Sequence, residues 1–176
     1  MTIRLVCAAL IGLWAQSASA GLFDLAPQAL PYPVPDVQFT SQSKIHTLGD
    51  YKGNKVMLWM FSTWCHTCVV GLRALQKQQA ILKNKALVIL AIRNYNNGGY
   101  RGVRMPGFID KFAPALKKEK NWVFGEASQA MYQQINAKKY PDIYFLIDEK
   151  GMVQTVSTAP NVSMDKIMAF IKDGKP

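Results

Sequence analysis

Two cysteines separated by two residues carry the clearest chemistry in this 176-residue chain. Cys65 and Cys68 follow a continuous apolar run, Val56–Phe61, and precede Val69–Lys83, where leucines recur at helical spacing. This order predicts a buried strand that leads into a helix, with both thiols at the junction. Free N–H groups and the dipole at a helix start favour an anion, so we expect Cys65 to be the nucleophilic thiolate. Cys68, one turn further on, is expected to bring its sulfur beside that of Cys65 and to resolve a mixed disulfide.

Three neighbours of the cysteines are candidates for supporting roles. A protonated His66 would stabilise the Cys65 thiolate and make the disulfide more oxidising, whereas an exposed ring would tune it little. Thr67 is expected to cap the helix or to form a local hydrogen bond, and Trp64 is expected to cover the dithiol. An inert structural disulfide is the alternative for the cysteine pair, but so short a loop constrains the unfolded chain little.

The N-terminus predicts export. Leu5–Trp14 is an apolar run too short to span a bilayer, and it is followed by small residues that permit cleavage after Ala20. The pattern predicts a Sec signal peptide over 1–20 and a periplasmic or otherwise exported protein, with a retained N-terminal anchor as the alternative. Cleavage would remove Cys7, which leaves only the Cys-x-x-Cys pair in an oxidising compartment and favours a working dithiol.

The composition bounds the rest of the chain. Hydrophobic residues make up 49% and charged residues 18% of it, which predicts one globular domain with a sizeable core, over 35–176. The net charge of +10 comes from scattered lysines and arginines, and export separates the protein from most nucleic acid, so no nucleic-acid binding is expected. The proline-rich segment 21–34 predicts an extended linker or arm that is too short for a dimerisation domain, so we expect a monomer.

Hydrophobic patterning places the cysteines within an α/β arrangement. Val56–Phe61, the following helix and a second apolar run, Leu87–Ile92, predict a βαβ unit with parallel strands. Further predictions are strands over 37–40 and 44–48, a helix over 108–116 broken at Pro114, a small strand over 122–124, a helix over 128–136, paired strands over 143–147 and 152–157, and a final helix over 164–172. The Arg93–Arg104 stretch contains a flexible Asn-Asn-Gly-Gly turn that either recognises a partner or only links two elements.

These features together resemble the thioredoxin superfamily and, within it, the exported TlpA/ResA-like thiol–disulfide oxidoreductases. The matching segments are Pro35–Val37, Leu48–Gly53, Trp64–Cys68, Tyr140–Pro141, Tyr144–Asp148 and Gly151. The resemblance implies an α/β, thioredoxin-like fold: a central mixed sheet flanked by helices, with an N-terminal β-hairpin extension. It also implies that Pro141 is a cis-proline that lies against the dithiol, and that the backbone of Tyr140 pairs with the bound substrate strand. We expect no cofactor and no bound metal.

Three positions depart from the family pattern. Gly71 stands where many members have a glutamate, and Arg73 stands where many have a proline. Trp59 stands where thioredoxins place a buried aspartate. The usual carboxylate for moving protons is missing from these places, so water or His66 must be considered as the proton acceptor near Cys68.

The expected activity is disulfide exchange with protein substrates, and the resemblance favours reduction with electrons from a membrane electron-delivery protein. A disulfide isomerase or oxidase is one alternative. A copper-binding chaperone that uses Cys65, Cys68 and a histidine is another, because soft thiolates bind Cu(I).

Overall fold

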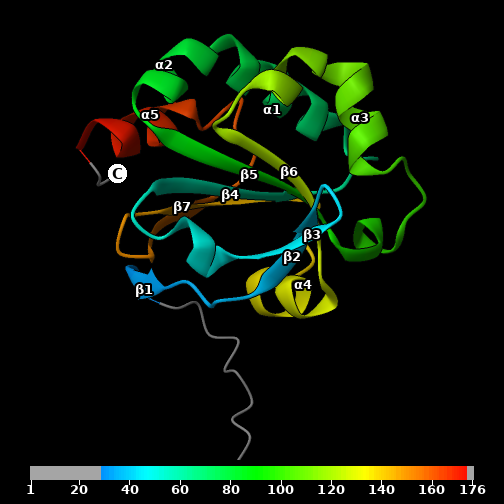
Figure 1. The fold of residues 1–176 in the computed structure, drawn as a ribbon, viewed down its shortest axis with the longest axis horizontal. Helices are drawn as coiled ribbons and strands as arrows, with labels where there is room; N and C mark the ends of the chain where they lie inside the picture. The colour runs from blue at the N-terminus through cyan, green and yellow to red at the C-terminus, as the bar shows by residue number, and fades with distance from the viewer. Residues whose placement is uncertain (1–28, 174–176) are drawn as a thin grey trace, which may run out of the picture.

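An eight-stranded mixed sheet, with helices on both faces, forms the frame of the protein (Figure 1). The computed structural model describes residues 29–173, so the predicted signal peptide and most of the proline-rich segment lie outside the described residues. The strands are β1 (Tyr32–Pro33), β2 (Gln38–Ser41), β3 (Lys44–Thr47), β4 (Lys55–Phe61), β5 (Leu87–Arg93), β6 (Trp122–Ala127), β7 (Asp142–Ile147) and β8 (Met152–Ser157). The α-helices are α1 (His66–Lys77), α2 (Gln79–Asn84), α3 (Met105–Phe112), α4 (Gln129–Ile135) and α5 (Met164–Asp173), and the 3₁₀-helices are η1 (Leu48–Tyr51), η2 (Tyr95–Gly99) and η3 (Pro114–Lys118). The predicted mixed sheet flanked by helices is confirmed.

Strand β4 lies inside the sheet, whose order is β1-β8-β7-β4-β5-β6-β2-β3, and leads into the cysteines. It pairs parallel with β5 and antiparallel with β7, and Trp59 lies opposite both Ala91 and Tyr144. Every residue of β4 after Lys55 is buried. The continuous apolar run in the sequence is what a strand covered on both faces requires.

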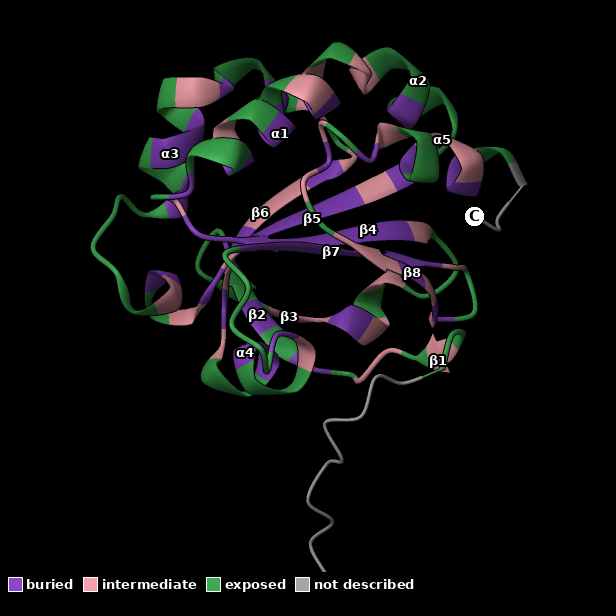
Figure 2. Ribbon diagram, turned by 180° about the vertical axis from the view of Figure 1, so that it is seen from behind, coloured by how far each residue is buried: buried purple, intermediate pink, exposed green. Residues whose placement is uncertain are grey.

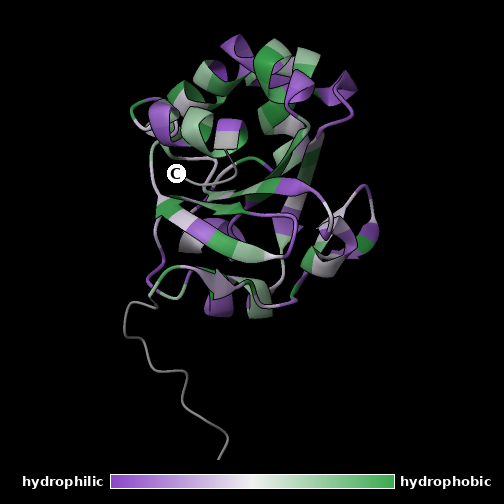
Figure 3. Ribbon diagram, turned by 90° about the vertical axis from the view of Figure 1, so that its left-hand side faces the viewer, coloured by the Kyte–Doolittle hydropathy of each residue, from purple (hydrophilic) through white to green (hydrophobic). Residues whose placement is uncertain are grey.

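Apolar side chains fill the space on both faces of the sheet. On one face, helices α1, α2, α3 and α5 pack over the sheet, and Trp59, Phe108 and Phe170 are fully buried there (Figure 1). On the other face, α4, η1 and β2 enclose a second cluster that includes Phe39 and Leu58. The central strands are buried along most of their length (Figure 2), and the helices carry both hydrophobic and hydrophilic positions (Figure 3). The end of β4, which leads into the cysteines, is therefore held between two packed layers.

The two edges of the sheet come from the N-terminal part of the described chain. Strand β1 pairs antiparallel with β8, with Tyr32 opposite Val153, so the end of the proline-rich segment lies along the domain. Strands β2 and β3 pair antiparallel across Gln42 and Ser43, which both have positive φ, and β2 also pairs with β6. None of the helices within residues 29–173 is long and apolar enough to cross a membrane.

The helix predicted after the cysteines is divided in two. Helices α1 and α2 meet at Gln78, whose backbone leaves helical geometry at φ −94° and ψ 4°. The side-chain oxygen of Gln79 accepts a hydrogen bond of 2.6 Å from Trp122 Nε1, which ties the start of α2 to β6. The predicted break at Pro114 is confirmed, because α3 ends before this residue and η3 begins at it.

Candidate active site

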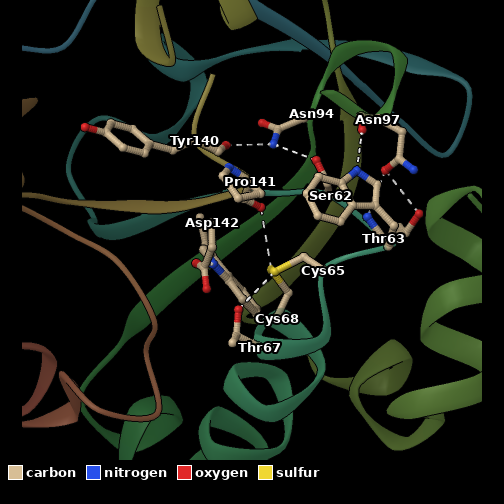
Figure 4. Close-up of a disulfide and its surroundings, with 12 residues drawn as sticks. Ser62, Thr63, Cys65, Thr67, Cys68, Asn94, Asn97, Tyr140, Pro141 and Asp142 are labelled. Atoms are coloured by element: carbon tan, nitrogen blue, oxygen red, sulfur yellow. Dashed lines mark hydrogen bonds between the residues drawn. A yellow bond between two sulfur atoms is a disulfide. The ribbon is translucent and has the colours of Figure 1, made fainter. Parts of the chain in front are cut away.

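The two cysteines lie where β4 passes into α1 and are joined by a disulfide (Figure 4). Cys65 immediately precedes the helix and has an extended backbone, with φ −74° and ψ 113°. Cys68 lies in the first turn, and the two Cα atoms are 5.3 Å apart. Cys65 keeps 6% of its surface exposed, whereas Cys68 has none. The predicted strand–helix junction is confirmed, and Cys65 is the cysteine of the pair that solvent reaches.

Two neighbours within α1 differ in what they contact. The hydroxyl of Thr67 lies 3.1 Å from Cys65 Sγ, where it can donate a hydrogen bond to the sulfur. Thr67 thus makes the predicted local hydrogen bond, and no side-chain cap precedes the helix. His66 is exposed, and its ring forms no hydrogen bond or ion pair with any residue that the structure describes.

Pro141 lies against the disulfide, immediately before β7. Its carbonyl oxygen accepts a hydrogen bond of 2.9 Å from Ser62 N and lies 3.6 Å from Cys68 Sγ (Figure 4). The expectation of a cis bond is wrong for this structure: within residues 29–173 the cis peptide bond is Leu30–Pro31, and the Tyr140–Pro141 bond is trans. Pro141 therefore reaches the dithiol through its carbonyl group, which the hydrogen bond from Ser62 holds in place.

The backbone of Tyr140 is bonded within the chain. Its N–H donates to Asn136 Oδ1 at 2.9 Å, and its carbonyl accepts from Asn136 Nδ2 at 2.8 Å and from Asn94 Nδ2 at 3.2 Å. Asn94 also donates to Ser62 Oγ at 3.0 Å (Figure 4). Two buried asparagines, Asn94 and Asn136, thus join the cysteine loop to the loop before β7. A substrate strand that pairs with Tyr140 would have to replace these bonds. The sequence signal for Asn94 is its position directly after β5, at the strand end where α/β sites gather.

A third buried asparagine, Asn97, ties the loop after β5 to the residues before Cys65. Its side-chain oxygen accepts a hydrogen bond of 2.8 Å from Thr63 N, and its carbonyl oxygen accepts one of 2.9 Å from Trp64 Nε1. The Trp64 ring is 45% exposed and packs on Tyr100, with 4.9 Å between the ring centroids. The Asn-Asn-Gly-Gly turn was predicted only as a flexible turn, whereas Asn97 is fully buried and organises the loop.

Asp142 supplies a carboxylate that the sequence did not reveal at this site. One of its oxygens and the sulfurs of Cys65 and Cys68 all lie within 4.8 Å of one another. Oδ1 accepts a hydrogen bond of 2.8 Å from Trp59 Nε1, and Oδ2 is buried without a well-formed hydrogen bond from any described residue. Burial raises the pKa of Asp142, while donation from Trp59 and the nearby backbone N–H of Ala159 lower it less. A polar residue between Pro141 and an apolar strand was the available signal.

The space around Gly71 explains one departure from the family pattern. A Cβ atom on Gly71 would lie 3.3 Å from Trp59 Cζ2 and 3.2 Å from Pro160 Cδ. The fully buried indole of Trp59 therefore occupies the side of α1 where a longer side chain would have to enter. The same indole holds Asp142, so a carboxylate from β7 lies beside the cysteines.

Neither histidine belongs to the group of possible metal ligands. Within residues 29–173, the His, Cys, Asp and Glu side chains that gather closely enough are Cys65, Cys68 and Asp142. The ring of His46 stacks on Phe39 in the β2–β3 hairpin, with 5.4 Å between the centroids. The histidine-assisted copper site therefore lacks its histidine here.

A family model identifies the family to which this chain belongs. The fold and the Cys-x-x-Cys disulfide define a thioredoxin-like thiol–disulfide oxidoreductase. A family model described as Redoxin matches residues 32–169, and the chain belongs to this family. The chain is 29% identical over 113 residues to the thioredoxin-like protein YneN of Bacillus subtilis (strain 168), and the match covers 62% of the chain and 59% of that protein.

Solved structures agree on the fold. A Chlorobium tepidum protein described as a thiol:disulfide interchange protein DsbE superposes with a TM-score of 0.61 at 20% identity, over 80% of this chain and 96% of that one. The exposed lipoprotein thioredoxin Etrx1 of Streptococcus pneumoniae strain TIGR4 superposes with a TM-score of 0.57 at 19% identity, over 79% of this chain and 99% of that one. At these identities the likeness bears on the fold, which is thioredoxin-like.

Proposed function

We propose that this protein is an exported thiol–disulfide oxidoreductase that reduces disulfides in protein substrates. The observation that carries the proposal is the disulfide at the start of α1, where Cys65 is the cysteine that solvent reaches and Cys68 is buried against the Pro141 carbonyl. A helix start favours a thiolate, and the Thr67 hydroxyl beside Cys65 adds a hydrogen-bond donor to that anion.

The reaction follows from the two positions. In the reduced protein the Cys65 thiolate attacks a substrate disulfide, forms a mixed disulfide and releases one substrate thiol. Cys68 then attacks Cys65 Sγ, which forms the Cys65–Cys68 disulfide and releases the second substrate thiol. The substrate gains two electrons and the protein loses two. The structure corresponds to the oxidised product, which a dithiol donor must reduce for the next cycle, and we propose a membrane electron-delivery protein for that step.

The proposed docking surface surrounds the cysteines. Trp64, Tyr100 and Val103 are exposed, and so is Tyr140, which precedes Pro141. The ring and carbonyl contacts of Trp64 and Thr63 with the loop place these apolar groups together. Exposed apolar side chains beside a reactive sulfur suit an unfolded or extended protein segment better than a small thiol. Trp64 would then cover the mixed disulfide, and the Tyr140 ring would limit which segments fit.

Trapping tests the activity. Cys68→Ala should accumulate Cys65 mixed disulfides with protein substrates in cell extracts of the host, and Cys65→Ala is the matched control that should accumulate none. Equilibration of the wild-type protein with glutathione then measures the reduction potential of the Cys65–Cys68 couple, which gives the direction of exchange. For this two-electron couple, about 30 mV corresponds to about 1.4 kcal/mol. A couple far more oxidising than glutathione would refute the reductant and favour an oxidase or isomerase.

Export is supported by the pattern of residues 1–20, and the same pattern predicts a mature N-terminus at Gly21. Fractionation of the host cell and N-terminal sequencing of the purified protein test both points. Sedimentation of that protein tests the proposed monomer.

A further inference from the structure

Asp142 is the acidic side chain that lies against the buried cysteine of the pair. Its carboxylate is within 4.8 Å of both sulfurs, a gap that one bridging water or a small side-chain rotation would close. Trp59 Nε1 fixes Oδ1 at 2.8 Å, which leaves Oδ2, a buried oxygen without a well-formed hydrogen bond from the described residues, free to accept a proton. A buried acceptor atom without a donor is uncommon in folded proteins and calls for an explanation.

We propose that Asp142 accepts the proton of the Cys68 thiol when Cys68 resolves the mixed disulfide, an inference that rests on the exchange reaction proposed above. The Cys68 S–H bond breaks and its proton passes to the Asp142 carboxylate, directly or through one water. The Cys68 thiolate then forms a bond to Cys65 Sγ, and the bond between Cys65 and the substrate sulfur breaks. The substrate sulfur leaves with the electron pair, and protonated Asp142 returns its proton to solvent. During reduction of the disulfide the proton travels in the opposite direction.

The surroundings of Asp142 suit this role. The titratable groups that face it are Cys65 just before α1, Cys68 in the first turn of α1, and Tyr144 from β7, whose own pKa is raised mainly by burial and slightly by Asp142. From β4 it meets the indole N–H of Trp59, and from the connection after β8 it meets the nearby backbone N–H of Ala159, which is too poorly placed for a well-formed hydrogen bond. Neither group titrates, and no described lysine or arginine holds Asp142 charged. Burial raises the pKa of Asp142, which makes its carboxylate a stronger base than an exposed one and brings it closer to a thiol in proton affinity.

The two thiol steps can be followed separately with 5,5′-dithiobis(2-nitrobenzoate). The reduced protein releases one thionitrobenzoate when Cys65 is modified, and a second when Cys68 displaces it from Cys65. In Asp142→Asn we expect the first release to stay within about twofold of wild type, because the amide keeps an acceptor for Trp59. We expect the second release to slow about tenfold or more near neutral pH, within the range of general-base effects, and to recover at high pH, where Cys68 ionises unaided. Glu149→Gln removes one charge from the exposed turn after β7 and should match wild type in both steps.

The pH profile separates a proton acceptor from a structural role. In wild type the second release should increase as Asp142 loses its proton, and this inflection should be absent from Asp142→Asn. Trp59→Phe keeps the carboxylate but removes its hydrogen-bond donor, so the inflection should move to higher pH. This second variant tests the proposal even if Asp142→Asn fails to fold. Equal second-release rates in Asp142→Asn and wild type across the pH range, or an inflection that Trp59→Phe does not move, would overturn the role of Asp142. Failure of the oxidoreductase proposal is a different result, in which Cys68→Ala traps no protein.

Discussion

Removal of the Asn97 side chain should release the loop beside the cysteines and destabilise the protein. Asn97 Oδ1 accepts from Thr63 N at 2.8 Å and from Arg93 Nε at 3.2 Å, and Nδ2 donates to the Arg101 carbonyl at 3.3 Å. Asn97 Oδ1 also lies 3.1 Å from the donating Thr63 hydroxyl, and in Asn97→Ala all four bonds are lost. Arg93 keeps its partner Glu126 at 2.6 Å, but the Thr63 N–H loses its acceptor in a partly buried place.

The expected loss in the free energy of unfolding is about 3–4 kcal/mol. The lost hydrogen bonds and the stranded Thr63 N–H together cost about 2–3 kcal/mol. The left-handed backbone of Asn97, at φ 55°, adds about 1 kcal/mol because alanine tolerates it less well than asparagine. Asn96 offers a matched control, since it has a similar φ of 46° but is exposed. Asn96→Ala should lose only the backbone contribution, about 1 kcal/mol.

Urea unfolding of the oxidised proteins measures the difference. With a urea dependence of about 1–3 kcal/mol per M, the midpoint of Asn97→Ala should lie about 1 M or more below that of Asn96→Ala. Alkylation of the reduced proteins by iodoacetamide gives a second readout, because Asn97 also holds Trp64 through its carbonyl. Midpoints that coincide for the two variants would refute the assignment of Asn97 as the residue that organises this loop.

Three further predictions concern the cysteines and the core behind them. Thr67→Val removes the hydroxyl 3.1 Å from Cys65 Sγ and should raise the pKa of the Cys65 thiol. Alkylation by iodoacetamide should then slow by about fivefold near neutral pH. An unchanged alkylation rate would exclude this hydrogen bond in the reduced state. Because burial raises the pKa of Asp142, the folded protein binds the proton of this carboxyl group more tightly than the unfolded chain does. The stabilisation is therefore complete below the unfolded pKa of Asp142 and declines as pH rises through the folded pKa. The decline amounts to about 1.4 kcal/mol for each unit by which the two pKa values differ. Thermal unfolding of Asp142→Asn should lose that decline relative to wild type, and parallel curves would count against it. Gly71→Glu should lower the free energy of unfolding by about 1–3 kcal/mol through its contact with Trp59, and a stability equal to wild type would show that the indole moves aside.

The parts of the fold that could be predicted are those with a strong local signal. The run at Val56–Phe61 indicated a buried strand because each residue had to be apolar, and β4 covers Lys55–Phe61. The cysteine spacing also identified the redox pair, because the whole motif lies in four consecutive residues and is therefore a local signal. The division of α1 from α2 at Gln78 could not be seen, because it depends on how Gln79 meets Trp122 in the folded state.

The polar framework of the site was beyond local pattern. Asn94 and Asn136 are 42 residues apart and meet only because β5 and α4 end at the same end of the strands. An asparagine beside a turn usually indicates solvent-exposed turn chemistry, which is why the loop after β5 was expected to be flexible. The burial of Asn97 reverses that interpretation, since each polar group of its side chain has a partner within the loop or in Thr63. The trans bond before Pro141 belongs with the same framework, which holds the Tyr140 carbonyl between two asparagines.

The carboxylate beside the cysteines follows from strand register. Asp142 lies opposite Phe61 in the antiparallel β4–β7 pair, and Trp59, two residues before Phe61, projects from the same face of the sheet. An indole at that diagonal position can cover Gly71 and also donate to Asp142, as it does here. A smaller residue at position 59 would leave the space over Gly71 empty and would leave the Asp142 carboxylate without its hydrogen-bond donor. Trp59, Gly71 and Asp142 therefore depend on one another, and a glutamate at position 71 would compete with the indole that positions the aspartate.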